Sequence, residues 1–192
     1  WALTANLSSA KKEEFPVKCT VEPRDKKEVD RIRKIAEKEE RLVTVVKESS
    51  AKRSPYAPFT TSTLQQTAST RLSFAPSRTM QVAQKLYEAG HITYMRTDST
   101  SLSKEALAQI FSVIEKEYGK EAMQPRTFKT KSKNAQEAHE AVRPTNASVK
   151  EAGSTPEQKK LYSLIRTRAI ASQMKDAELL KTKVTTLSLI HI

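Results

Sequence analysis

A tyrosine, an arginine and an aspartate occupy every second position near the middle of the chain, as Tyr94, Arg96 and Asp98. An extended backbone would place these three side chains on one face and the residues between them on the other, because strand side chains alternate with a period of two. A phenol oxygen can attack a phosphodiester, and a guanidinium can hold a phosphate through its planar fork of donors. The spacing therefore suits phosphodiester chemistry, with Tyr94 as the nucleophile and Arg96 as the phosphate contact, although a tyrosine taken by itself is more often a half-buried strand residue.

The phenol of Tyr94 needs help to lose its proton at neutral pH. A neighbouring guanidinium favours the charged form, so Arg96 is expected to supply part of that help. Asp98 has two interpretations that the sequence leaves open. It either orients Arg96 or another basic group, or it caps the turn with Ser99 before the next helix.

A second group of functional side chains lies in residues 136–145, which read Gln-Glu-Ala-His-Glu-Ala-Val-Arg-Pro-Thr. His139 and Arg143 are four residues apart, so a helix would place both on one face. Two neighbouring cationic donors would suit a nucleic-acid phosphate, whereas the plainer interpretation is a capped helix end before Pro144. A zinc-protease interpretation fails because the second histidine of that motif is absent.

A third group is the run of threonines and serine at positions 60–63, which follows Ala57-Pro58-Phe59. At a helix N-terminus these hydroxyls can donate hydrogen bonds to a phosphate. Ordinary helix capping is the stronger explanation for at least one of them.

All three segments resemble signatures of one family, the type IA DNA topoisomerases. Residues 90–99 are similar to the active-site motif, residues 139–145 to a His-Glu-Ala-Ile-Arg-Pro-Thr motif with Val142 for isoleucine, and residues 57–66 to the start of the tyrosine domain. Methionine after the tyrosine resembles bacterial topoisomerase I, since proline usually follows it in the topoisomerase III branch.

The resemblance implies roles for individual residues. Tyr94 would form a covalent link to a 5′-phosphate of cleaved DNA, with Arg96 as a second catalytic residue. Arg96, His139, Arg143 and Asp98 would bind DNA, and His139 would contact DNA or handle a proton near the tyrosine.

Composition agrees with a polyanionic partner. The 192 residues carry 34 Lys and Arg against 22 Asp and Glu, a net charge of +12. Such an excess suits nucleic acid but does not define a fold. The single cysteine excludes an internal disulfide framework and fits a reducing cytosol. No apolar run approaches the ~20 residues of a membrane span.

Two absences bear on cofactors. The three glycines are too far apart for a phosphate-binding glycine loop, and the four aspartates form no Asp-x-Asp pair. Exchange of one phosphodiester for another conserves bond energy, so no nucleotide hydrolysis is required. By resemblance, the full enzyme binds Mg²⁺ through an acidic cluster in a separate domain. We expect no metal ligands in this chain, and we expect the chain alone to be inactive.

The pattern of elements predicts an α+β fold that is mostly helical. Strand pieces are expected at 2–7 and 17–21, a helix capped by Asp25, and a strand at 42–46 before an exposed connection at 47–58. Helices at 60–72 and 76–89 are followed by a strand through Tyr94, and a helix from Ser103 by a basic loop at 119–134. A helix at about 155–175 and a strand at 183–187 complete the chain. Helix, turn, helix and strand in that order suggest a winged helix.

The resemblance implies the domain organisation. Residues 1–40 would end the base of a toroidal type IA enzyme, and 41–54 would be a strand into its arch. Residues 55–153 would form a winged-helix-like tyrosine domain, and 154–186 a helix and return strand. Residues 187–192 resemble a translated sequencing adapter and are left out of the functional argument.

The function implied is that of a central fragment of a type IA topoisomerase. Such an enzyme cleaves one DNA strand through a 5′-phosphotyrosine intermediate and relaxes negative supercoils without ATP. We expect a monomer acting on single-stranded or underwound DNA in the bacterial cytoplasm, at the nucleoid. The alternative is a non-catalytic winged-helix DNA-binding module. An RNA-binding domain is disfavoured because only 6% of residues are aromatic.

Overall fold

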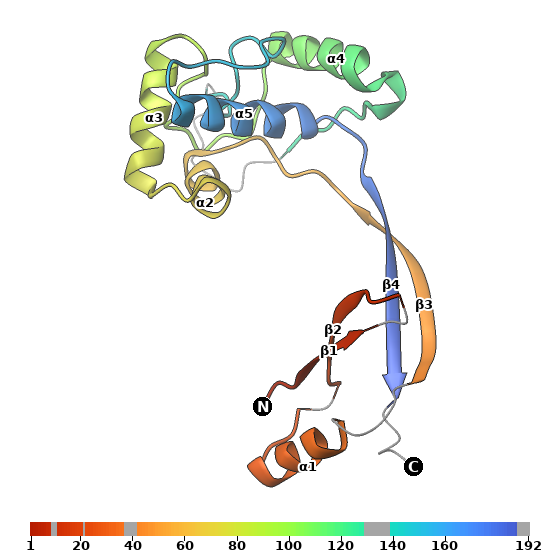
Figure 1. Ribbon diagram of the computed structural model, residues 1–192. Helices are drawn as coiled ribbons and strands as arrows, with labels where there is room; N and C mark the ends of the chain where they lie inside the picture. Colours follow the sequence, from red (N-terminus) through yellow and green to blue (C-terminus); the bar gives the residue numbers. More distant parts are fainter. Residues whose placement is uncertain (9–10, 21, 37–41, 129–138, 188–192) are drawn as a thin grey trace. The chain divides into compact units, whose positions relative to one another are not determined.

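The computed structural model describes residues 1–8, 11–20, 22–36, 42–128 and 139–187 (Figure 1). The chain forms two units, one of residues 1–51 with 180–192 and one of residues 52–179. Helices and strands are both present, so the predicted α+β class is confirmed.

The first unit opens with an antiparallel hairpin of β1 (Thr4–Ser8) and β2 (Glu14–Lys18). α1 (Lys26–Ala36) follows. The backbone N–H of Glu28 donates to a carboxylate oxygen of Asp25 over 2.8 Å, which is a helix N-cap. The first predicted strand piece and the predicted cap are confirmed, whereas β2 lies at 14–18 and shares only residues 17 and 18 with the piece predicted at 17–21.

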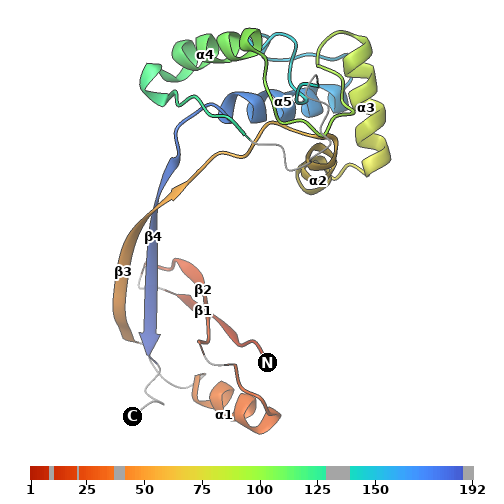
Figure 2. The same cartoon turned by 180° about the vertical axis from the view of Figure 1, so that it is seen from behind.

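A second two-stranded sheet pairs β3 (Leu42–Arg53) with β4 (Ala177–Leu187), which run in opposite directions in both views (Figures 1 and 2). The exposed connection predicted from residue 47 is therefore wrong for residues 47–53. Side chains 45–50 are all exposed. A two-stranded ribbon with solvent on both faces needs no alternation of apolar and polar residues. The hydrophobic pattern of the sequence therefore could not reveal that the strand continues past residue 46.

The second unit is built on a helical hairpin, α2 (Thr61–Leu72) and α3 (Pro76–Glu88). Thr60 and Thr63 form a capping box, in which each side chain accepts a hydrogen bond from the other residue's backbone N–H. Ser73 ends α2 with a φ of 57°, in the left-handed region. The two predicted helices and the turn between them are confirmed.

Two further helices complete this unit, α4 (Lys104–Tyr118) and α5 (Pro156–Ala171), with a short 3₁₀ turn at Lys120–Ala122. Ser103 caps α4, as predicted. In both views α3 lies across the N-terminal end of α5, and α4 lies along its other end (Figures 1 and 2).

Two clusters of buried apolar residues hold these helices together. The larger one joins α2, α3 and α5 to apolar residues inside the three predicted motifs, and it includes Phe59, Leu64, Ala83, Leu86, Ile92, Met95, Val142, Leu161 and Ile165. The smaller one joins α4 to the C-terminal half of α5 through Ile110, Val113, Ile114, Ala169 and Ile170. Tyr118, the last residue of α4, is 51% exposed.

The strand predicted through Tyr94 is wrong. Residues 89–103 carry one isolated bridge, between Ile92 and Pro144, and no strand. Proline has no backbone N–H, so the ladder cannot continue through it. The helix–turn–helix order is present, but no strand stands in the place of the wing.

The predicted domain boundaries stay predictions. α5, which the sequence assigns to a separate segment, packs against α2, α3 and α4 within the second unit. Three lysines of the predicted basic loop (Lys129, Lys131 and Lys133) and residues 188–192 lie outside the described residues.

Candidate nucleic-acid and catalytic site

The residues around Tyr94 alternate between core and solvent although they form no strand. Met95 is 1% exposed and Thr97 is 8% exposed, whereas Tyr94 is 46% exposed and both Arg96 and Asp98 are exposed. The predicted outward face of Tyr94, Arg96 and Asp98 is therefore confirmed. The buried residues between them anchor this segment to the core.

The Tyr94 ring packs against Tyr87 of α3, with ring centroids 5.2 Å apart and planes at 63°. This edge-to-face arrangement is a favourable aromatic geometry. Among the described residues, the Tyr94 hydroxyl has no hydrogen-bond partner. Tyr87 thus contacts the ring of a half-exposed tyrosine whose hydroxyl is not engaged by a described residue.

Thr61, the first residue of α2, fastens the Tyr94 segment to the helix. Its backbone N–H donates to the carbonyl of Thr97 over 2.9 Å. Its hydroxyl donates to the carbonyl of Met95 over 2.8 Å and accepts from the Thr97 N–H over 2.8 Å. The hydroxyl cluster predicted at 60–63 therefore includes a cap, Thr60, and a clamp, Thr61.

Residues 141–145 lie extended between Phe59 and the start of the Tyr94 segment. The N–H of Val142 donates to the Phe59 carbonyl over 2.8 Å, and the N–H of Thr93 donates to the Arg143 carbonyl over 2.9 Å. The helix predicted to carry both His139 and Arg143 is therefore wrong, and so is a capped helix end before Pro144. These backbone bonds to segments on both sides replace the helical ones.

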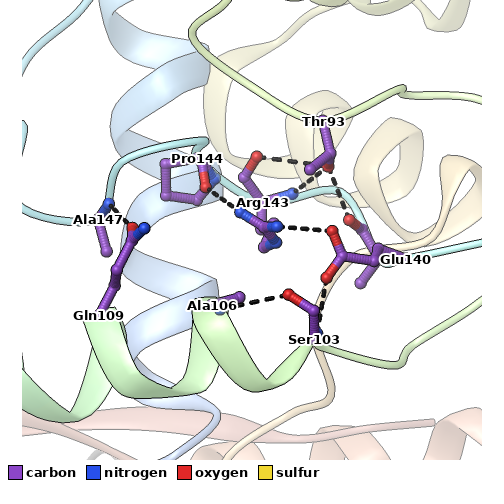
Figure 3. Close-up of polar contacts among 9 residues, drawn as sticks. Thr93, Ser103, Ala106, Gln109, Glu140, Arg143, Pro144 and Ala147 are labelled. Atoms are coloured by element: carbon purple, nitrogen blue, oxygen red, sulfur yellow. Dashed lines mark hydrogen bonds and ion pairs between the residues drawn. The ribbon is translucent and has the colours of Figure 1, made fainter.

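Glu140 and Arg143 form a pair that ties this extended segment to α4 (Figure 3). Arg143 Nη2 donates to Glu140 Oε2 over 2.6 Å, and the backbone N–H of Ser103 donates to Glu140 Oε1 over 2.6 Å. The Thr93 hydroxyl donates to the Ala141 carbonyl over 2.7 Å. One carboxylate thus joins the second motif to the residue that caps α4.

The charges of this pair are largely withdrawn from solvent. The Arg143 side chain is 13% exposed and that of Glu140 is 28% exposed. Burial alone would raise the pKa of the Glu140 carboxyl, but hydrogen bonds from Ser103 and Arg143 outweigh it, and the pKa is lowered. Arg143 Nε is buried and has no partner among the described residues. The guanidinium therefore points into the protein, where Nη1 donates to the Pro144 carbonyl over 2.9 Å.

Arg96, Asp98 and His139 meet at an open hollow of about 400 Å³ over the N-terminus of α2, where Thr60, Thr61, Ser62 and Thr97 complete the lining. This hollow brings together three of the predicted site residues from two distant segments. Tyr94 and Arg143 do not line it. A helix N-terminus beside an arginine and a histidine suits an anion, since the positive end of the helix dipole and the guanidinium lie at the same hollow.

Within the described part of the chain, no three His, Cys, Asp or Glu side chains lie together as a metal site would require. No described helix is long and apolar enough to cross a membrane.

Comparisons with known proteins agree with this architecture. A family model described as DNA topoisomerase matches residues 1–190. The chain is 54% identical to DNA topoisomerase 1 of Streptomyces coelicolor over 140 residues, which are 70% of this chain and 15% of that protein. It is 45% identical to DNA topoisomerase 1 of Helicobacter pylori over 167 residues, 80% of this chain and 23% of that protein.

Among solved structures, full-length topoisomerase I from Thermotoga maritima matches with a TM-score of 0.73 and 32% identity, over 98% of this chain and 32% of that one. The chain therefore belongs to the DNA topoisomerase family. Its relatives are bacterial topoisomerase I enzymes, so the resemblance predicted from the three motifs is confirmed. The chain spans only 15% and 23% of the two curated relatives named above.

Two structural contributors were not predicted from the sequence. Glu140 lies beside His139 in the second motif, but its bond to the Ser103 backbone joins residues 37 apart. The bonds from Thr61 to the Tyr94 segment span 34 to 36 residues. Neither has a local signal, because a hydroxyl or carboxylate near a helix start suggests capping first.

Proposed function

We propose that this chain is the tyrosine-bearing part of a type IA DNA topoisomerase. Tyr94 cleaves one strand of DNA and carries its 5′-phosphate, which lets the parent enzyme relax negative supercoils without ATP. The observation that carries the proposal is the exposed Tyr94 on one face with Arg96, beside a hollow where Arg96 and His139 meet over the N-terminus of α2. Both family membership and this chemistry point to DNA as the partner.

In the proposed reaction the Tyr94 oxygen forms a bond to phosphorus while the bond from phosphorus to the 3′-oxygen breaks. The phenol loses a proton, and the departing 3′-oxygen gains one. The 3′-hydroxyl later attacks the phosphotyrosine and restores both groups. Because one phosphoester replaces another, the step is close to neutral in energy.

Arg96 is proposed to hold the non-bridging phosphate oxygens through its guanidinium fork. Positive charge placed where negative charge develops is a strong source of catalysis. His139, exposed across the same hollow, is proposed to contact the phosphate or to move the proton of the 3′-oxygen. Asp98 lines the hollow and is proposed to orient one of these two cations or to contact DNA.

Arg143 is proposed to position the segment that carries His139, since its guanidinium is paired with Glu140. Mg²⁺ in the parent enzyme would neutralise phosphate charge, and we propose that acidic residues outside this chain hold it. On this basis the isolated chain is inactive. A winged-helix-like role for α2 and α3, monomeric action, a preference for single-stranded or underwound DNA, and a nucleoid location are parts of the same proposal.

The test replaces the matching segment of the Thermotoga maritima enzyme, whose structure matches 98% of this chain, with residues 1–186. The chimera is incubated with Mg²⁺ and a single-stranded oligonucleotide labelled at one end, then denatured. A 3′-end label should stay with the protein and a 5′-end label should not, because the protein holds the 5′-phosphate of the downstream fragment.

Tyr94→Phe is the matched control, because it keeps the ring against Tyr87 and removes only the attacking oxygen. It should abolish the labelled adduct. An adduct that persists in Tyr94→Phe, or that keeps the 5′-end label, would rule out the proposed role.

A further inference from the structure

Three arginines surround Tyr56 in the second unit, and none of these four residues lines the Arg96 hollow. Arg53 ends β3, Arg71 lies in the last turn of α2, and Arg168 lies on α5. Tyr56 is 59% exposed. Four side chains from three parts of the chain thus gather at one surface.

Aromatic rings orient this cluster. The guanidinium carbon of Arg168 lies 4.2 Å from the ring centroid of Phe59 and 4.9 Å from that of Tyr56. Arg53 Nη2 donates to the Tyr56 hydroxyl over 3.3 Å. Cation–π contacts of this kind hold a guanidinium in place while leaving most of its N–H groups free.

The positive charge of the cluster is uncompensated. No carboxylate of the described residues lies within 4 Å of Arg53, Arg71 or Arg168. The four other arginines that pair in this unit each meet a carboxylate, and they are Arg78, Arg126, Arg143 and Arg166. Arg96 is the only other arginine of this described unit without a carboxylate partner, so the cluster brings three of the four unpaired guanidinium groups to one place.

The charges of the cluster act on one another. Burial first and the charge of Arg71 next lower the pKa of the Arg168 guanidinium. The hydrogen bond from Arg53, followed by the charge of Arg53, lowers the pKa of the Tyr56 phenol. Like charges held close together without an anion favour the arrival of one.

We propose that Arg53, Tyr56, Arg71 and Arg168 form a binding site for single-stranded DNA, with backbone phosphate between the arginines and a base stacked on the exposed part of Tyr56. Guanidinium forks suit phosphate oxygens. An exposed aromatic ring accepts any base, which fits a site that follows a strand rather than reads its sequence. The site would hold the DNA strand at a second place besides Tyr94. The assignment of DNA as its ligand rests on the proposed function.

The test measures binding rather than cleavage. The full chain, in a Tyr94→Phe background, is titrated against fluorescein-labelled oligothymidylate of eight residues and against an abasic oligomer of equal length. Fluorescence anisotropy is recorded at several salt concentrations. Because no cleavage is needed, failure of the Tyr94 mechanism would leave this result unchanged.

Charge is tested with Arg71→Gln, since Arg71 is exposed. It should weaken oligothymidylate binding about tenfold and reduce the salt slope by about one, as expected for one lost phosphate contact. Lys160→Gln on the exposed side of α5 is the matched control, and it should change affinity less than about twofold. Equal effects of Arg71→Gln and Lys160→Gln would overturn the site.

Stacking is tested with Tyr56→Leu. Loss of one base–aromatic contact should weaken binding of oligothymidylate about tenfold and leave the abasic oligomer unaffected. Equal loss for both oligomers would refute stacking. Competition with polyaspartate distinguishes DNA from an acidic protein segment as the ligand. If polyaspartate displaces oligothymidylate when both are present at the same concentration of negative charges, the site binds acidic protein segments and the assignment to DNA is overturned.

Discussion

Arg96 and Arg143 come from two motifs of the same family, but the structure uses them differently. Arg96 is exposed beside the α2 hollow and meets no carboxylate of the described residues within 4 Å. Arg143 is 13% exposed in its side chain and donates to Glu140 over 2.6 Å. An arginine whose donors are satisfied inside the protein has few left for a phosphate. The group to which an arginine donates its hydrogen bonds therefore indicates its role better than its position in a sequence motif does.

The largest expected effect is on Arg96. In the chimera that carries residues 1–186, Arg96→Gln should slow formation of the 3′-end-labelled adduct by about 100-fold, because one charged donor to the phosphate is lost. Its free energy of unfolding should stay within about 0.5 kcal/mol of wild type, since the side chain is exposed. A rapid-quench time course and urea denaturation measure the two quantities. A large loss of stability would place Arg96 among the structural residues.

Arg143 should show the opposite balance. Arg143→Met leaves the Glu140 carboxylate half-buried without its cation, and we expect a loss of about 2–3 kcal/mol in the free energy of unfolding. Urea denaturation followed by circular dichroism measures it, since most of the helices lie in the second unit. Arg78→Met breaks a more exposed pair with Glu157 and is the control, with an expected loss under about 1 kcal/mol. Equal losses would show that the Glu140 pair is no stronger than a surface one.

The sequence predicted one of these roles better than the other, and the reason is physical. The outward placement of Tyr94, Arg96 and Asp98 depends only on an extended backbone. The prediction was therefore correct even though this segment forms no strand. The placement of His139 and Arg143 depended on a helix, and residues 141–145 instead bond to Phe59 and Thr93, which are distant in sequence. Helices α2 and α3 were predictable because their caps and breakers are local. Long-range pairing carries no such local signature.

The pair of Glu140 and Arg143 should also give a pH signature. The pKa of Glu140 is lowered in the folded state, so its contribution to stability is complete above the unfolded carboxyl pKa of about 4.3 and is lost as the pH falls through the folded value. Glu140→Gln should therefore be less stable than wild type at pH 7, and the difference should shrink below about pH 4. Urea titrations at pH 7, 5, 4 and 3 measure it.

Glu115→Gln on the exposed side of α4 is the matched control for loss of one carboxylate. Glu115 accepts no hydrogen bond from a described side chain, so its difference from wild type should be small at every pH. A Glu140→Gln difference that stays constant from pH 7 to 3 would contradict the charge-assisted bonds of Figure 3 as its source.

The smallest expected effects separate two neighbouring hydroxyls that the sequence treated as one cluster. Thr60→Ala removes a helix cap and should cost about 1 kcal/mol. Thr61→Val should cost about 1–2 kcal/mol, because the N–H of Thr97 loses its acceptor in a largely buried place. Stability alone hardly distinguishes the two, but amide hydrogen exchange does. Thr61→Val should speed exchange at Thr97 while Thr60→Ala should not, since only the Thr61 hydroxyl reaches the segment that presents Arg96. Equal exchange at Thr97 in both variants would mean that packing of Met95, rather than the Thr61 clamp, holds that segment in place.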